Sequence, residues 1–404
     1  MIDSFASADA MPRPQTALTR QEIATAIRRA ALWMLHSGIQ DISDEPKLRG
    51  GVNAWYDLKQ KRFTFLYSEI TGYSIPSFLA LTDYLKDEAV LDRAEAAADW
   101  LLRIPFNRAL GLVETRFAHL PGYRNYHHWA FTFDNVMSAY GLSKLYAITG
   151  KERYLSAALT IVDRLLSSAW SPNGMILPIF DFGRGEWMEL SDKWSTQRGS
   201  FLAKVALCLS SLYGLTGEER YRSAAFRLGE GALRAQDGSG RFVTREEDRS
   251  THLHPHCYTI EGLLCLASEF GESSFWKPCE AGLAWLWRHQ SEDGGFPTLV
   301  TPSHIAEFQR SDILAQVLRL TLLLDSARRV GILPERIGRL VARLLEFQHH
   351  APDSHDGGFF YGWEVDGERK DHLNAWCTMF AIQGLMLYEE FLGGGEVAFP
   401  RYFC

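Results

Sequence analysis

The sequence has no run of about 18 uncharged apolar residues, the length that a membrane-spanning helix requires. Its first 18 residues, MIDSFASADAMPRPQTAL, have neither the basic start nor the apolar stretch of a secretory signal. Both absences predict a cytoplasmic protein without a membrane span. The 42 Lys and Arg form no long basic run and are outnumbered by 49 Asp and Glu, so we expect no nucleic-acid partner.

Cysteine is scarce, and the usual metal-binding motifs are missing. The six Cys residues are scattered, mostly in apolar helical segments, as expected of reduced core thiols in a cytoplasmic protein. They are Cys208, Cys257, Cys265, Cys279, Cys377 and Cys404. The chain has no CxxC or HExxH, and the three alternate His residues of THLHPHC (251–257) come from one segment, whereas zinc ligands usually come from several. We therefore expect neither a metal nor a cofactor.

Two kinds of helical segment alternate along almost the whole chain. The first kind is amphipathic, with apolar residues recurring at intervals of three and four, as at Leu155, Ala158, Val162 and Leu165. These segments are 21–35, 88–104, 151–169, 218–235, 273–290 and 334–348. The second kind is apolar nearly all round and is therefore expected to be buried on all sides. These segments are 68–85, 131–148, 199–215, 256–270, 311–324 and 374–391.

Each buried segment follows an amphipathic one, which makes six outer–inner pairs. Six such pairs predict an all-α fold, the (α/α)6 toroid, in which two helical rings are concentric. The repeat also explains why 404 residues, more than one compact domain usually holds, need no domain boundary. We predict a single barrel domain at 19–393, with an N-terminal segment (1–18) and a C-terminal tail (394–404).

Glycine-rich turns follow several outer segments: QDGSGRF (236–242), QSEDGGF (290–296) and HDGGFF (355–360). Asp-Gly and Gly-Gly predict tight turns with positive φ. The Q…DGGF pattern resembles the repeat signature of terpene cyclases and protein prenyltransferases, which are also double helical rings. The acidic DxDD and DDxxD clusters and the Asp-x-Cys spacing of those enzymes are absent, so this resemblance implies the fold rather than the chemistry.

Polar residues gather where long connections enter the inner helices, and loops of that length usually serve a function. The candidate catalytic residues are His256, Tyr258, Glu261, Glu69, His128, Asp134 and Asp312. The candidate substrate-binding residues are Tyr67, Tyr73, Arg124, His127, Trp129, Lys193, Trp194, Arg198, His254, Arg310, Asn374 and Trp376. Glu69 and Glu261 interrupt apolar runs, so each needs a basic partner or a function, and burial would raise its pKa. The alternative for any one residue is helix capping or loop packing.

The segment HPHCYTIEGLL (254–264) resembles the NPxMHxxEALL segment of N-acylglucosamine 2-epimerases and cellobiose 2-epimerases. Pro255 and Glu261 match, but Tyr258 stands where that family has His. The family's second motif, a His–Glu pair near a late helix, has no counterpart here beyond His372 in DHLNAW (371–376). These enzymes belong to the carbohydrate-active (α/α)6 superfamily, which includes unsaturated glucuronyl hydrolases, glucuronyl C5-epimerases and polysaccharide lyases. YSEITGY (67–73) also resembles uncharacterised proteins of bacterial polysaccharide clusters. The resemblance implies a small sugar or uronic-acid-containing glycan as substrate.

The abundance of aromatic residues, with 12 Trp, 15 Tyr and 24 Phe, agrees with sugar binding, because ring faces stack on pyranose C–H groups. We expect proton abstraction of the epimerase type, which needs a base, an acid and cations around the enolate. Any of His256, Tyr258 and His128 could serve as the acid or the base. Three alternatives stay open: glycoside hydrolysis by a carboxyl pair, elimination by a polysaccharide lyase, and non-catalytic glycan binding.

Overall fold

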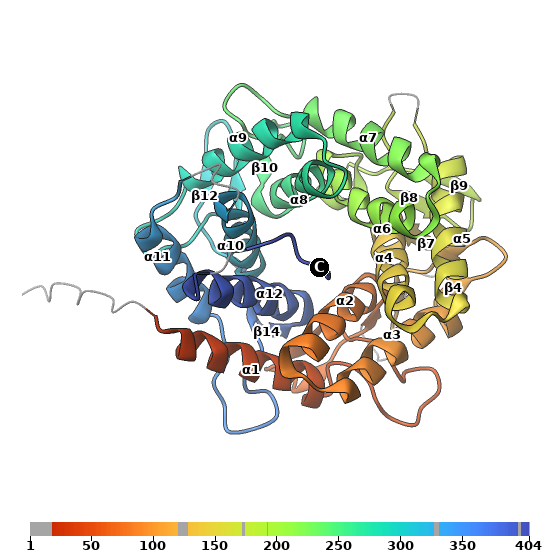
Figure 1. Cartoon of the computed structure of the whole chain (residues 1–404), viewed down its shortest axis with the longest axis horizontal. Coiled ribbons are helices and arrows are strands. Elements are labelled where there is room, and N and C mark those ends of the chain that lie inside the picture. The colour runs from red at the N-terminus through yellow and green to blue at the C-terminus, as the bar shows by residue number, and fades with distance from the viewer. Residues whose placement is uncertain are drawn as a thin grey trace, which may run out of the picture.

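The computed structural model describes residues 18–119, 128–171, 174–191, 193–326, 331–394 and 397–403, and these form two concentric rings of helices (Figure 1). The outer ring holds α1 (Arg20–His36), α3 (Leu91–Arg103), α5 (Glu152–Ser168), α7 (Glu219–Leu233), α9 (Trp276–Trp287) and α11 (Pro334–Leu345). The inner ring holds α2 (Ser68–Leu85), α4 (Thr132–Thr149), α6 (Ala206–Thr216), α8 (Leu253–Glu269), α10 (Ser311–Ser326) and α12 (Ala375–Leu392). The predicted (α/α)6 toroid is confirmed.

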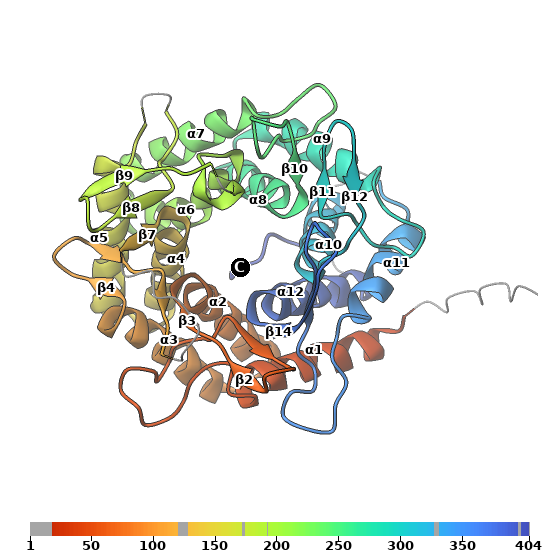
Figure 2. The same cartoon turned by 180° about the vertical axis from the view of Figure 1, so that it is seen from behind.

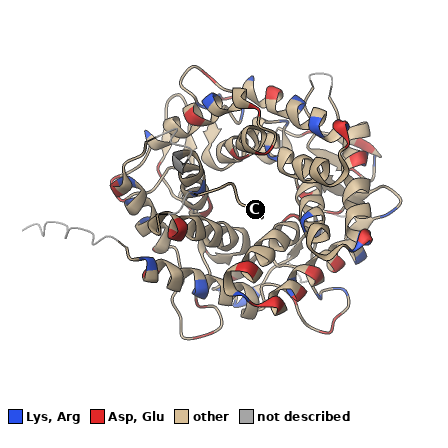
Figure 3. Cartoon of the chain, in the orientation of Figure 1, with Lys and Arg blue, Asp and Glu red and all other residues tan. Residues whose placement is uncertain are grey.

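The two helix types occupy the rings that their patterns predict. Outer helix α11 buries only one stripe, with Ile337, Leu340 and Leu344 facing inward, whereas most of inner helix α2 is buried. Most charged residues accordingly lie on the outer ring, and the inner ring carries few of them (Figure 3). Within the described residues, no helix is long and apolar enough to cross a membrane.

The third inner helix departs from the regular pattern. A 3-10 turn, η3 (Ser200–Val205), precedes α6, where the sequence predicted one continuous helix from residue 199. Neighbouring α8 packs its backbone directly against this turn at Gly262, where an added Cβ atom would lie 2.2 Å from the Ala203 carbonyl oxygen. This close approach brings Lys204 to the barrel axis.

Repeated glutamines tie neighbouring hairpins together. After α9, the Gln290 amide donates to the Gly294 carbonyl at 3.3 Å and to the Arg336 carbonyl of α11 at 3.0 Å. The same two-carbonyl contact recurs at Gln40, Gln236 and Gln348. Gln348 reaches Ala26 of α1 at 2.9 Å and so joins the sixth hairpin to the first. The predicted positive φ is confirmed at Gly294, where it is +91°.

Short strands connect the hairpins on one face of the barrel, the face seen in Figure 2. In one sheet, β1 (Trp55–Asp57) pairs antiparallel with β14 (Arg369–Asn374), which links the connection before α2 to the one before α12. The other strands are β2 (Arg62–Phe63), β3 (Leu66–Tyr67), β4 (Phe106–Asn107), β5 (Leu112–Val113), β6 (Arg116–Phe117), β7 (Trp129–Phe131), β8 (Ile179–Asp181), β9 (Glu186–Met188), β10 (Thr251–His252), β11 (Leu299–Val300), β12 (Ile305–Ala306) and β13 (Phe360–Trp363). The inner helices therefore begin on this face, which we call the mouth.

The C-terminal segment enters the barrel from the opposite face and ends near the axis (Figure 1). Tyr402 and Phe403 are buried, and the Gln383 amide of α12 donates to the Tyr402 carbonyl at 2.7 Å. The Phe403 ring centroid lies 4.6 Å from the guanidinium carbon of Arg319. The tail thus packs beneath the inner helices.

Candidate functional site

The inner helices present three layers of side chains to the barrel axis. On α8 these are His254, Tyr258 and Glu261, spaced four and then three residues apart. At a rise of about 1.5 Å per residue, the second and third layers lie about 6 and 10 Å below the first. We call them the mouth, ring and charged layers. The equivalent residues are Asp312, Gln316 and Arg319 on α10, and Trp376, Phe380 and Gln383 on α12.

The charged layer contains a buried carboxylate held by two cations. Glu261 lies 2.7 Å from the Lys204 ammonium and 2.5 Å from the Arg319 guanidinium, and all three side chains are fully buried. Arg319 also donates to the Gln383 amide oxygen at 2.8 Å. The sequence left open whether Glu261 was catalytic or part of a structural ion pair. In the structure it forms ion pairs with Lys204 and Arg319 beneath the ring layer.

The ring layer closes the axis above these charges. Tyr73 on α2 and Tyr258 on α8 come from the first and fourth inner helices, yet their hydroxyl oxygens are 3.3 Å apart. Phe133 stacks on Tyr258 with centroids 5.0 Å apart, and Phe380 meets Tyr73 edge-on at 5.5 Å. The Lys204 ammonium lies 4.1 Å from the Tyr258 ring centroid. Aromatic faces therefore separate the charged layer from the mouth.

On one side of the mouth layer, two carboxyl groups lie close enough to affect each other's ionisation. Glu69 lies in the first turn of α2 and Asp134 in the first turn of α4, with Tyr67 near Glu69 and Thr115 near Asp134. Burial raises the pKa of Glu69, and burial together with the Glu69 charge raises the pKa of Asp134 well above its usual value. Ionisation of both groups at once is therefore disfavoured, while the nearby Arg116 favours a negative charge on the pair.

On the opposite side, a neutral histidine lies beside a buried ion pair. His254 Nδ1 is 2.7 Å from the Gln316 amide oxygen, and burial lowers the pKa of His254 to about 4. The Arg310 guanidinium bonds Asp312 at 3.1 and 2.5 Å, and the Trp376 indole donates to Asp312 at 3.1 Å. Burial opposes ionisation of Asp312, but Arg310, His254 and Trp376 together outweigh that effect and lower the pKa.

Half-buried aromatic rings line the mouth around these groups. Trp194 lies 5.7 Å from His254, centroid to centroid, and meets Phe201 edge-on at 5.1 Å. Trp376 lies 6.4 Å from Trp55. Such rings offer flat faces of the kind on which sugars stack.

His256 lies apart from the other candidate catalytic residues. Its side chain points outward from α8, where Nδ1 accepts from the Phe242 backbone amide at 3.2 Å and Nε2 is 3.2 Å from the Gly282 carbonyl oxygen. Both ring nitrogens serve the contact between inner and outer rings, so we leave His256 out of the proposed site. His252, His254 and His256 therefore do not converge on one point.

Several candidate substrate-binding residues have structural contacts away from the carboxyl pair. Asn374 caps α12 by accepting from the Cys377 amide at 3.2 Å, and Trp129 donates to Asp181 at 3.3 Å. His128 and Lys193 are exposed at the rim. Arg124 and His127 lie outside the described residues.

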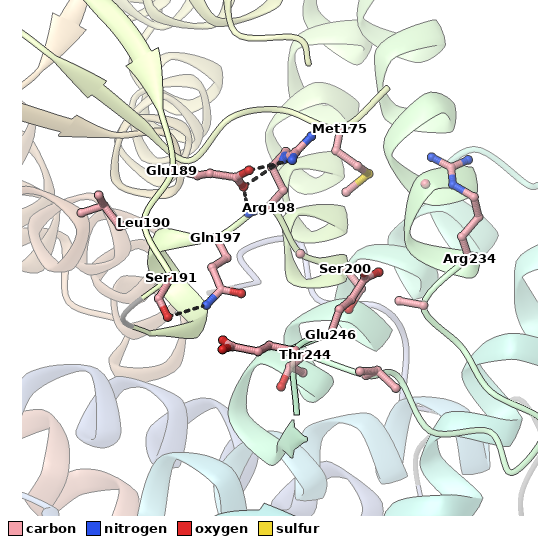
Figure 4. A pocket seen from close by; sticks show the side chains of 15 residues that line it. Met175, Glu189, Leu190, Ser191, Gln197, Arg198, Ser200, Arg234, Thr244 and Glu246 are labelled. Atoms are coloured by element: carbon pink, nitrogen blue, oxygen red, sulfur yellow. Dashed lines mark hydrogen bonds and ion pairs between the residues drawn. The ribbon is translucent and has the colours of Figure 1, made fainter. Parts of the chain in front are cut away.

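Arg198 lines a separate surface cavity of about 500 Å³ between the end of α7 and the segment before η3 (Figure 4). There it bonds Glu189 at 2.9 and 2.6 Å, and Gln197 donates to the Ser191 carbonyl at 3.2 Å. The lining of this cavity includes none of the mouth carboxyls. We therefore place Arg198 beside the mouth layer and not within it.

Sequence reasoning missed Lys204, Arg319, Gln316 and Arg116. Lys204 and Arg319 are single charges in apolar inner segments, which is the same signal that singled out Glu69 and Glu261. Gln316 and Arg116 carry no comparable signal, because neither stands near a recognisable motif.

Comparison with solved structures shows that several proteins share this architecture. A cellobiose 2-epimerase from Bacillus thermoamylovorans B4167 superposes with a TM-score of 0.73 at 12% identity, covering 91% of this chain and 100% of that one. A sugar epimerase from a ruminal bacterium gives 0.74 at 12% identity, covering 91% and 98%. An unsaturated glucuronyl hydrolase from Streptococcus agalactiae gives 0.65 at 14% identity, covering 96% and 95%. No family model and no curated protein sequence matches the chain. The chain shares the (α/α)6 fold of these carbohydrate-active enzymes.

Proposed function

We propose that the protein is an enzyme that transfers protons on a sugar or a uronic-acid-containing glycan, in the manner of an epimerase. The observation that carries this proposal is the placement of two proton-transfer groups on opposite sides of the mouth. The Glu69–Asp134 carboxyl pair lies in the first turns of α2 and α4, and neutral His254 lies in the first turn of α8. Inversion at a sugar carbon needs a base on one face and an acid on the other.

The protonation states suit these roles. His254, with its pKa lowered to about 4, is neutral at pH 7 and has a lone pair to accept a proton. Burial and the neighbouring Glu69 charge raise the pKa of Asp134, which favours a proton on the carboxyl pair. We assign His254 as base and the Glu69–Asp134 pair as acid for one direction of the reaction, with the roles exchanged in the other.

A sugar at the mouth supports the same assignment. Trp194 and Trp376 provide half-buried ring faces on the His254 side, and Arg116 places a cation near the carboxyl pair. A cation beside the reacting carbon stabilises an enolate or a uronate carboxylate. The similar folds of the sugar epimerases support this substrate class.

Proton transfer can be tested by incubating the protein in deuterated water with D-mannose, D-glucose, cellobiose and glucuronate-terminated oligosaccharides. We expect carbon-bound deuterium to appear by NMR in one sugar class. Asp134→Asn and His254→Gln should each lower the exchange rate about 100-fold or more, because each removes an acid–base group. Exchange in none of these sugars, or wild-type exchange in both variants, would contradict the proposal.

His256→Gln is the matched control for His254→Gln. Both histidines are buried on α8, two residues apart, but His256 contacts only structural partners among the described residues. We expect His256→Gln to lower the melting temperature and to leave the exchange rate per folded molecule within about three-fold. A loss of exchange equal to that of His254→Gln would instead support the sequence-based assignment of His256 as acid or base.

Hydrolysis is a second candidate because a carboxyl pair that retains a proton can protonate a glycosidic oxygen. Asp312, whose pKa is lowered, provides an ionised carboxylate on the other side of the mouth. The same incubations distinguish the two reactions. Hydrolysis releases new reducing ends and takes oxygen from water without placing deuterium on carbon. Glycan binding with no turnover would indicate a non-catalytic protein.

A further inference from the structure

A continuous set of hydrogen bonds runs from the bottom of the barrel to His254 at the mouth. The Gln383 amide nitrogen donates to the Tyr402 carbonyl, so its oxygen faces Arg319, which donates to it at 2.8 Å. Arg319 then donates to Glu261 at 2.5 Å. The Gln316 amide nitrogen lies 3.4 Å from the same Glu261 oxygen, and the Gln316 amide oxygen lies 2.7 Å from His254 Nδ1.

The donor directions in this set are determined by the carboxylate at its centre. Glu261 is bound by both Lys204 and Arg319, so it can only accept hydrogen bonds. Gln316 must therefore turn its NH2 group toward Glu261 and its oxygen toward His254. An amide oxygen cannot donate, so His254 Nδ1 must carry the hydrogen, and the lone pair is then on Nε2 across the ring.

We propose that Gln316 is a positioning residue that holds His254 in the Nδ1–H tautomer and so keeps Nε2 free to act as the base. This inference rests on the proposed function for its catalytic consequence, but the tautomer itself does not depend on that function. Glu261, Lys204 and Arg319 act one step further back, because they orient the Gln316 amide.

Asp312 is the other group that could orient the ring, and its contacts make it the weaker one. Its Oδ2 lies 3.4 Å from His254 Nδ1. The same oxygen already accepts from Arg310 at 2.5 Å and from the Trp376 indole at 3.1 Å. Gln316 lies closer to Nδ1 and has no second donor on its amide oxygen among the described residues. The hydrogen bond to Gln316 therefore decides the tautomer.

The tautomer can be read directly from the ring nitrogen shifts of the full-length protein labelled with 15N-histidine, with the His254 signals assigned by their loss in His254→Gln. We expect wild-type His254 to show a protonated Nδ1 and an unprotonated Nε2 at pH 7. Gln316→Met, which preserves side-chain length without a polar group, should convert this single state into a mixture. An Nε2–H tautomer in the wild type, or an unchanged spectrum in Gln316→Met, would overturn the inference.

Two further variants separate positioning from general damage. Gln316→Glu keeps an oxygen where the amide oxygen contacts His254 Nδ1, and a carboxyl oxygen accepts a hydrogen bond whether or not the group is ionised. We expect it to restore the Nδ1–H tautomer. Thr321→Val removes a different buried polar group of α10, a hydroxyl that accepts from the Trp287 indole at 2.9 Å. It should leave the His254 tautomer unchanged. A tautomer mixture in either variant would count against a specific role for Gln316.

Kinetics then separate this inference from the proposed function. With a sugar that exchanges deuterium, Gln316→Met should lower kcat about ten-fold or more and leave KM within about two-fold, because the base is misoriented while the sugar contacts remain. If no sugar reacts and the nitrogen shifts follow the expectations above, the proposed function fails and the positioning role stands. If the sugar reacts and Gln316→Met has wild-type kcat, the positioning role fails alone.

Discussion

Replacement of Glu261 by Gln tests whether the charged layer depends on its central anion. In the native protein, one carboxylate lies between two cations at 2.7 and 2.5 Å, and none of the three is exposed. The net charge of the group is thus +1, and Glu261→Gln raises it to +2 without changing its volume. Removing one partner of a buried ion pair typically costs about 3–5 kcal/mol, because the remaining charge is desolvated and uncompensated.

Glu189→Gln provides the matched control on the protein surface. Glu189 bonds Arg198 through two hydrogen bonds of 2.9 and 2.6 Å, a geometry as good as that of the buried pair, but both side chains are about one-third exposed. Water screens such a pair, so its loss should cost no more than about 1 kcal/mol. The two variants make the same chemical change and differ mainly in burial.

Urea unfolding of the wild type and both variants at pH 7 measures these free energies, provided that the transition is reversible and two-state. We expect Glu261→Gln to lose at least about 2 kcal/mol more than Glu189→Gln. The triple variant K204M/E261L/R319M, which removes all three charges, should recover much of that loss, since apolar replacements of buried ion pairs are often neutral or stabilising. Equal losses in the two single variants would refute the reasoning.

Three further predictions concern the turns, the tail and the carboxyl pair. Gly294→Ala should lower the melting temperature more than Gly271→Ala, because both have positive φ but only the Gly294 Cβ would meet a backbone oxygen, at 2.4 Å from Arg339. Phe403→Ala should cost about 3–5 kcal/mol in unfolding free energy, since it removes a fully buried ring. The folded protein holds the Asp134 proton at higher pH than the unfolded chain, whose value is near 3.8, so stability should fall as pH rises through the raised folded pKa. Melting curves against pH should show a smaller fall in Asp134→Asn.

The sequence predicts the fold well because each helix carries its own periodicity. An amphipathic stripe such as that of α11 indicates a helix at the surface, and an apolar segment such as α12 indicates one buried on all sides. The 3-10 turn before α6 could not be predicted in this way. It depends on the close approach of Gly262 to the Ala203 backbone, a contact between residues 59 positions apart.

The sequence indicated where polar residues gather but not which of them come into contact. Polar residues at the inner helix starts indicated the mouth, and Glu69, Asp134, Tyr258 and Asp312 do lie around the axis. The choice between His254 and His256 could not be made from sequence, because two residues on a helix differ by about 200° in direction. Only the packed structure shows His256 turned toward α9 and His254 turned toward Gln316.

The sequence by itself determined the alternation of outer and inner helices, the turn glycines and the end of the barrel at which polar groups gather. These features depend on periodicity and local backbone geometry, which residues close together in the sequence determine. Tertiary structure alone decided that Glu69 meets Asp134, that Lys204 and Arg319 hold Glu261, and that Gln316 orients His254. Those contacts join neighbouring hairpins that are far apart in the sequence, so their distances and protonation states arise only when the hairpins pack together.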